Sequence, residues 1–255
     1  MKDTMKIDQQ KFQQQNPNVK LEYFDELGST NDYAKKSLIN FNTDGLVVAN
    51  RQSSGRGTRG RVFHSPETGM YMSIYFPVTS SQINPGRLTA NVATSIVRIL
   101  RKRFKKDIKI KWINDLYLDS KKVAGILCEL VTDDQNQLAG VVIGAGVDLV
   151  TTEYPDNMLR EAGNITESIT TAEATDLVSE ITQAILKKRQ TILSDVIDPL
   201  YEQLMFLIGM QVTIDQTNNL LYGRVSRVNA DNILMLKDGS KEYPVMFGRV
   251  IDWKA

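Results

Sequence analysis

Cysteine and histidine are almost absent from the sequence, which has one of each, Cys128 and His64. A single cysteine excludes an internal disulfide and a thiolate-rich zinc site, and a single histidine excludes a multi-histidine metal centre. Neither of these two kinds of metal site is therefore expected. The low cysteine content is also typical of the reducing cytoplasm, which is the location we expect.

An excess of charge and long apolar runs are lacking as well. The 31 basic and 30 acidic residues leave a formal net charge of +1, so no overall field attracts nucleic acid or an anionic membrane. No apolar run approaches the ~20 residues that a membrane-spanning helix needs. The polar segment 1–15 also lacks the apolar stretch of a signal peptide. We expect a soluble protein with no membrane partner.

The hydrophobic pattern predicts a mixture of strands and helices rather than a regular alternation of the two. Strands are expected over 19–27, 45–51, 69–77, 108–112 and 138–150. Helices are expected over 30–39, from Pro85 into the basic stretch 101–106, and over 171–193 and 198–207. Segment 116–131 is typical of a hairpin that turns near Asp119 and Ser120. In segment 69–77, Met70, Met72, Ile74 and Phe76 should share one face of the strand.

Three segments follow from this pattern: an N-terminal arm over 1–18, which is a short helix or a loose arm, a large domain over 19–208, and a small module over 209–255. The last segment contains short apolar runs separated by turn residues, which predicts a small β-barrel. The fold class is therefore α+β, with a mixed sheet, because the regular strand–helix alternation of a doubly wound fold is missing.

A loop rich in arginine and glycine, SSGRGTRGRVFHS, covers Ser53–Ser65 between two predicted strands. Glycines let backbone amides approach a ligand closely, and arginine side chains complement phosphate oxygens. The loop can therefore be a phosphate cradle, but residue chemistry also leaves a nucleic-acid contact or an ordinary solvated loop open. The near-neutral total charge argues against nucleic acid.

A second polar cluster lies where a strand meets the predicted hairpin, with Asn114 and Asp115 on one side of the turn and Lys122 on the other. Alone it is compatible with an ordinary turn. Gly144 and Gly146 interrupt the apolar strand over 138–150, and glycines inside a strand indicate a place where a ligand or another backbone comes close. The sequence contains no Walker-type phosphate loop and no complete dinucleotide fingerprint.

Taken together, five motifs in this order closely resemble the biotin protein ligases. They are STND (Ser29–Asp32), QSSGRGTRGR (Gln52–Arg61), KWINDLYL (Lys111–Leu118), KKVAGIL (Lys121–Leu127) and VVIGAGVDL (Val141–Leu149). The resemblance is strong over residues 21–149, and the β-module agrees with the SH3-like end domain of that family. It implies a catalytic domain of the biotin/lipoate ligase type, which is similar to class II synthetases.

The resemblance implies an ATP-dependent enzyme that joins biotin to ATP, forms biotinyl-5′-AMP and transfers biotin to a lysine of a biotin carboxyl carrier domain. Mg²⁺ would arrive with ATP and keep most of its waters. The implied catalytic residues are Lys122, Arg56 and Asp115. The implied biotin-binding residues are Ser29, Thr30, Asn31, Gln52, Gly55, Gly57, Lys122, Gly125, Leu127 and Gly144. The implied ATP-binding residues are Arg56, Arg59, Arg61, Phe63, Asn114 and Asp148.

The sequence departs from the family pattern at four positions. Thr58 stands where many members have an arginine linked to holding the adenylate in place. Phe63 replaces the usual tryptophan, and Asp148 replaces the usual asparagine of GxN. Ile113 replaces a proline, which we regard as minor. We therefore expect biotin activation with faster release of the adenylate.

Two other functions remain open at this point: a lipoate or octanoate ligase of the same fold, and a non-catalytic module that binds biotin or a nucleotide. The Ser-Thr-Asn segment favours biotin, because a ureido ring needs polar partners that an alkyl chain does not. Some family members carry an N-terminal DNA-binding domain. Only about 20 residues precede the first expected strand here, so we expect no operator binding. A homodimer is possible, because family members often form one.

Overall fold

The structure is a computed structural model that describes residues 6–78, 83–151, 154, 162–216 and 219–254. Its first layer is a seven-stranded sheet in the order β1-β2-β3-β7-β6-β5-β4. The strands are β1 (Lys20–Leu27), β2 (Gly45–Gln52), β3 (Met70–Pro77), β4 (Lys109–Lys111), β5 (Asp115–Leu118), β6 (Lys121–Thr132) and β7 (Leu138–Val147). Only the β1–β2 pair is parallel, and each other neighbouring pair is antiparallel.

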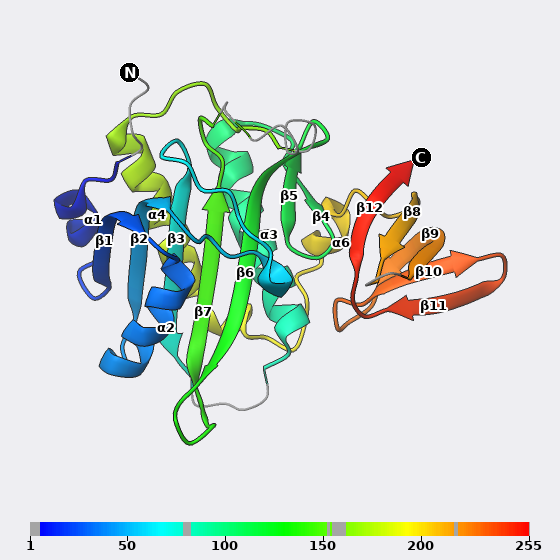
Figure 1. Cartoon of the computed structure of the whole chain (residues 1–255), viewed down its shortest axis with the longest axis horizontal. Helices are drawn as coiled ribbons and strands as arrows, with labels where there is room; N and C mark the ends of the chain where they lie inside the picture. The colour runs from blue at the N-terminus through cyan, green and yellow to red at the C-terminus, as the bar shows by residue number, and fades with distance from the viewer. Residues whose placement is uncertain (1–5, 79–82, 152–153, 155–161, 217–218, 255) are drawn as a thin grey trace.

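Helices cover both faces of this sheet (Figure 1). Helices α3 (Pro85–Phe104) and α4 (Thr171–Lys187) lie on one face, and α2 (Thr30–Phe41) lies on the other, against β2, β3 and β7. Alternate residues of a strand therefore enter different cores. Met70, Met72, Ile74 and Phe76 all pack on the α3 and α4 side, as predicted, whereas Tyr75 packs with α2.

The helix boundaries follow from local chemistry. Ser29 caps α2 by accepting a hydrogen bond from the Asp32 amide, and Asn84 caps α3 in the same way at its first turn. Thr170 and Glu173 form a reciprocal capping box at the start of α4. The helix predicted over 171–193 is divided into α4 and α5 (Arg189–Ile192), and the one predicted over 198–207 is the short α6 (Leu200–Leu204).

The N-terminal segment forms a short helix, α1 (Gln9–Gln15), that packs on α4. Phe12 is fully buried in the main core. The Asp8 amide donates to Thr175 Oγ1, and Asn16 Nδ2 donates to Ser179 Oγ, both at 2.8 Å. The sequence left a helix and a loose arm open, and the structure shows the helix.

The C-terminal segment forms a five-stranded antiparallel sheet in the order β11-β10-β9-β8-β12. Its strands are β8 (Gln211–Asp215), β9 (Leu220–Val228), β10 (Leu234–Asp238), β11 (Lys241–Val245) and β12 (Arg249–Lys254), of which β12 was not predicted. Trp253 of β12 packs against Tyr117 and Phe206, so the small sheet joins the large one beside β5. The α+β fold class is confirmed, and the domain boundaries stay a prediction.

In the described part of the chain, no helix combines the length and the apolar character needed to cross a membrane.

Candidate active site

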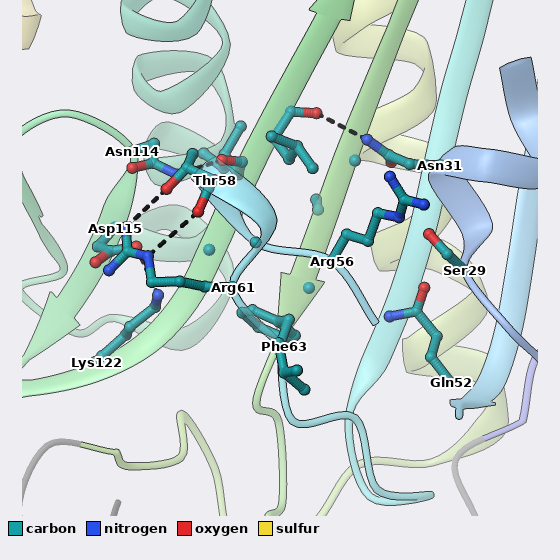
Figure 2. Close-up of a pocket in the computed structure, with 18 of the residues that line it drawn as sticks. Ser29, Asn31, Gln52, Arg56, Thr58, Arg61, Phe63, Asn114, Asp115 and Lys122 are labelled. Atoms are coloured by element: carbon teal, nitrogen blue, oxygen red, sulfur yellow. Dashed lines mark hydrogen bonds and ion pairs between the residues drawn. The ribbon is translucent and has the colours of Figure 1, made fainter. Parts of the chain in front are cut away.

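A cavity of about 370 Å³ opens on the same face of the large sheet as α2. Its walls come from the start of α2, the Arg/Gly loop, strands β5, β6 and β7, and the first residue of β12 (Figure 2). The predicted site residues that line it are Ser29, Thr30, Asn31, Gln52, Arg56, Gly57, Arg61, Phe63, Asn114, Asp115, Lys122, Gly125, Leu127 and Gly144. Segments far apart in the sequence thus meet in one cavity.

Asn31 is the fixed point at one end of the cavity. Its Nδ2 donates to the Leu127 carbonyl at 3.2 Å and to Glu129 Oε2 at 2.8 Å, while its Oδ1 accepts from Ser73 Oγ at 2.6 Å. Asn31 and Ser73 are buried. A buried amide with partners on both sides has one orientation, so this side chain is in place before any ligand binds.

Gln52 and Thr30 extend this polar end. The Thr30 amide and hydroxyl both donate to Gln52 Oε1, at 2.8 and 3.1 Å, and Gln52 Nε2 donates to Ser65 Oγ at 3.0 Å. A second hydrogen of Gln52 Nε2 and a second lone pair of Asn31 Oδ1 can each make a further bond beyond those found among the described residues. The end of the cavity can therefore both donate and accept.

The strand glycines make room for side chains rather than for another backbone. A Cβ at Gly144 would overlap the carboxamide of Asn31, and one at Gly125 or Gly146 would overlap the ring of Phe63. The sequence predicted that a ligand or another backbone approaches Gly144 and Gly146, and in the structure a side chain approaches each of them instead. Gly125, Gly144 and Gly146 thus set how deep the cavity is.

The opposite end of the cavity is cationic. Lys122 Nζ lies 2.6 Å from Asp115 Oδ1 and 5.5 Å from the centre of the Phe63 ring. Lys111 is buried beside them, with its Nζ 3.3 Å from the Tyr117 hydroxyl and 4.2 Å from the Trp253 ring centre. This end is suited to an anion.

The Arg/Gly loop crosses the cavity as a small hairpin. Arg56 and Val62 form a bridge, the Gly57 amide donates to the Arg61 carbonyl at 2.7 Å, and residues Thr58–Gly60 make one 3-10 turn, η1. The loop places its two described arginine side chains differently. Arg56 Nε lies 2.8 Å from Asp32 Oδ2 near the Asn31 end, whereas Arg61 lies near Asp115 and Lys122 (Figure 2).

The structure therefore brings together two of the three predicted catalytic residues, Lys122 and Asp115, and holds Arg56 at Asp32 instead. Three further predicted residues do not line the cavity as described. Gly55 is buried within the loop, where a Cβ would lie 2.5 Å from the Phe63 carbonyl oxygen. The side chain of Arg59 lies outside the described residues. Asp148 is buried and is not among the wall residues.

Sequence reasoning missed several wall residues, of which Lys111 and Arg249 are charged. Lys111 directly precedes Trp112 in the KWIND motif, and its alternation with Ile110 on a short strand could have identified it. Arg249 had no comparable signal, because β12 itself was not predicted. Glu129 was missed too, although it holds both Asn31 and Lys35, the latter at 2.6 Å.

Asp148 differs from the predicted ATP-binding residues that line the cavity. It is only 7% exposed, and its Oδ1 has no hydrogen-bond partner among the described residues. Burial raises the pKa of Asp148 to about 7, although the nearby charge of Lys122 opposes the rise. The Asp148 carboxyl does not line the cavity and interacts electrostatically with Lys122, and its contact with a nucleotide stays a prediction.

The described walls of the cavity offer few ligands for a metal ion. Asp115 is the one carboxylate among these residues, and it is paired with Lys122. Within the described ranges there is no group of three His, Cys, Asp or Glu side chains that could hold a metal. A divalent cation here would therefore depend on a ligand for most of its coordination.

Comparison with known proteins relates this chain to one group. A family model described as the Biotin/lipoate A/B protein ligase family matches residues 23–148. The bifunctional ligase/repressor BirA of Bacillus subtilis is 29% identical over 226 residues, which cover 84% of this chain and 68% of that protein. The BirA protein of Salmonella typhimurium is 32% identical over 136 residues, 53% of this chain and 42% of that protein.

Solved structures show the same fold. The biotin protein ligase of Aquifex aeolicus in complex with biotin and ATP superposes with a TM-score of 0.75 at 23% identity, and covers 90% of this chain and 96% of its own. The biotin protein ligase of Leishmania major in complex with biotinyl-5-AMP gives a TM-score of 0.62 at 19% identity, with 89% of this chain and 99% of that chain covered.

We predict that Asp148→Asn changes how stability depends on pH. The folded protein holds a proton on Asp148 up to about pH 7, whereas the unfolded chain loses it near pH 3.8, so wild-type stability falls as the pH rises through that window. Relative to wild type, the variant should therefore gain about 2 to 4 kcal/mol between pH 4 and pH 8.5. Urea unfolding across this pH range measures the difference.

The exposed Asp134→Asn substitution is the matched control and should leave the wild-type pH profile in place. Parallel profiles for wild type and Asp148→Asn would contradict the assignment of a raised pKa to Asp148.

Proposed function

We propose that the chain is a biotin protein ligase of the biotin/lipoate A/B protein ligase family, whose model matches residues 23–148. In this proposal it joins biotin to ATP, releases pyrophosphate, and transfers biotin from biotinyl-5′-AMP to a lysine of a biotin carboxyl carrier domain. The observation that carries the proposal is the two-ended cavity, with fixed amides at one end and the Lys122–Asp115 pair at the other.

The amide end supports biotin over lipoate. The ureido ring of biotin carries two N–H donors and one carbonyl acceptor, and Asn31 and Gln52 offer an acceptor and a donor in fixed positions. The dithiolane ring of lipoate and the alkyl chain of octanoate have no such groups, so they would leave the second lone pair of Asn31 Oδ1 and the second hydrogen of Gln52 Nε2 unused.

The cationic end supports the first chemical step. A carboxylate oxygen of biotin attacks the α-phosphorus of ATP, and the bond between that phosphorus and the pyrophosphate oxygen breaks. Both reactants and the leaving group are anions, so fixed cations lower the barrier. Lys122 is placed to neutralise the carboxylate and the α-phosphate, and Asp115, 2.6 Å from its Nζ, orients it. Mg²⁺ enters with the triphosphate and supplies further positive charge.

In the second step the amino group of the carrier lysine attacks the acyl carbon of the adenylate. The acyl–phosphate bond breaks, AMP leaves, and the attacking nitrogen loses a proton. Among the described wall residues Asp115 is the one carboxylate, and it is therefore the residue we assign to accept a proton or orient the incoming amine. The same cavity then serves both reactions.

The proposal is tested with radiolabelled biotin or lipoate, ATP and Mg²⁺, with and without a carrier domain. We expect biotin-dependent exchange of pyrophosphate into ATP and labelling of the carrier lysine by biotin. Labelling by lipoate in its place would favour the lipoate ligase, and binding without turnover would favour the non-catalytic module. Either result would overturn the proposal that the chain is a biotin protein ligase.

We predict that Lys122→Ala slows adenylate formation by about 100-fold, because a fixed cation at the reacting phosphate is lost. The rate of biotin-dependent pyrophosphate exchange measures this. Lys121→Ala is the matched control, since Lys121 is exposed and does not line this cavity. An unaltered exchange rate in Lys122→Ala would refute the role given to that side chain.

We also predict that the adenylate leaves this enzyme faster than it leaves the Thr58→Arg variant, which restores the arginine common in the family. The added guanidinium can form charge-assisted hydrogen bonds with the adenylate phosphate. The half-life of bound biotinyl-5′-AMP, measured by chasing labelled adenylate with unlabelled biotin and ATP, should therefore be longer in the variant. Equal half-lives would contradict the prediction.

A further inference from the structure

Thr58 and Arg61 are hydrogen-bonded to each other at the cationic end of the cavity, and both residues line the cavity. We propose that Thr58 is a positioning residue: its hydroxyl fixes the Arg61 guanidinium to receive the phosphate groups of the nucleotide. The inference rests on the proposed function, because it takes ATP as the anion. Under this inference Thr58, which replaces the arginine of many family members, has a function of its own.

The geometry consists of two contacts from one guanidinium to one residue. Arg61 Nη2 donates to Thr58 Oγ1 at 2.8 Å, and Arg61 Nε donates to the Thr58 carbonyl at 3.2 Å (Figure 2). The Arg61 amide also reaches the Thr58 carbonyl, at 3.4 Å. The backbone and the side chain of Arg61 are therefore both tied to the η1 turn.

The two side-chain contacts depend on Thr58 in different ways. The carbonyl acceptor persists with any residue at position 58, whereas the Oγ1 acceptor requires a hydroxyl. Arg61 is exposed, and a free arginine side chain loses considerable rotamer entropy when it binds an anion. A second contact that holds the guanidinium in advance removes part of that cost.

The contacts also leave Arg61 able to bind an anion. They use the Nε hydrogen and one Nη2 hydrogen, so both Nη1 hydrogens and one Nη2 hydrogen remain for phosphate oxygens, counted over the bonds of the described residues. An arginine at position 58 could not play this part. A guanidinium has no acceptor atom, and its charge would repel that of Arg61.

The test compares Thr58→Val, which keeps the shape and removes the hydroxyl, with Thr58→Ser, which keeps the hydroxyl. Arg61→Gln and the double variant Thr58→Val/Arg61→Gln complete a mutant cycle. Thr191→Val on α5 is the matched control, since Thr191 is exposed and outside the cavity. The Kd of ATP with Mg²⁺ is measured by calorimetry without turnover, alongside the KM of ATP and of biotin in pyrophosphate exchange.

We expect Thr58→Val to raise the Kd and KM of ATP by about three- to tenfold, and to leave the KM of biotin within about twofold of wild type. Thr58→Ser should restore ATP binding, and Thr58→Val should have no further effect once Arg61 is Gln. Unchanged ATP binding in Thr58→Val, or an undiminished effect in the Arg61→Gln background, would overturn the positioning role alone. A wild-type protein that binds no ATP would overturn the proposed function with it.

Discussion

Three glycines, Gly125, Gly144 and Gly146, leave part of one face of the β6–β7 pair without side chains. The site lies in the space above them. Asn31 occupies the position over Gly144, and the Phe63 ring lies over Gly125 and Gly146. Because α2 covers only the neighbouring part of this face, the Arg/Gly loop can close over the rest. The cavity is thus a consequence of missing side chains in an otherwise closely packed sheet.

The two ends of this cavity differ in chemistry. Amides and hydroxyls held by hydrogen bonds form one end, with the Arg56–Asp32 ion pair beside them. Lysine and arginine side chains form the other end, together with Asp115, the one carboxylate among the described wall residues. Such an arrangement suits an elongated ligand with a neutral polar head and an anionic tail, and it orients that ligand by chemistry as well as by shape.

Most of the site could be predicted because its residues lie in contiguous motifs whose spacing sets them on adjacent strands and loops. The hairpin turn at Asp119 and Ser120 is one such case, since both residues adopt positive φ as a tight turn requires. Arg249 could not be predicted, because only the docking of a separate sheet brings it to the cavity. The burial of Asp148 likewise depends on segments distant in sequence. Its amide donates a hydrogen bond to the Val123 carbonyl, and its carbonyl accepts one from the Ile165 amide.

The side chains allowed at positions 144 and 31 depend on each other during evolution. The glycine serves no turn, and its backbone is ordinary strand, so the asparagine opposite is the side chain that a Cβ there would meet first. A lineage that replaced Asn31 by a smaller residue would free position 144 to vary, and a change at position 144 alone would displace the amide from Ser73, Leu127 and Glu129. The two positions, 113 residues apart in the numbering, are therefore expected to covary.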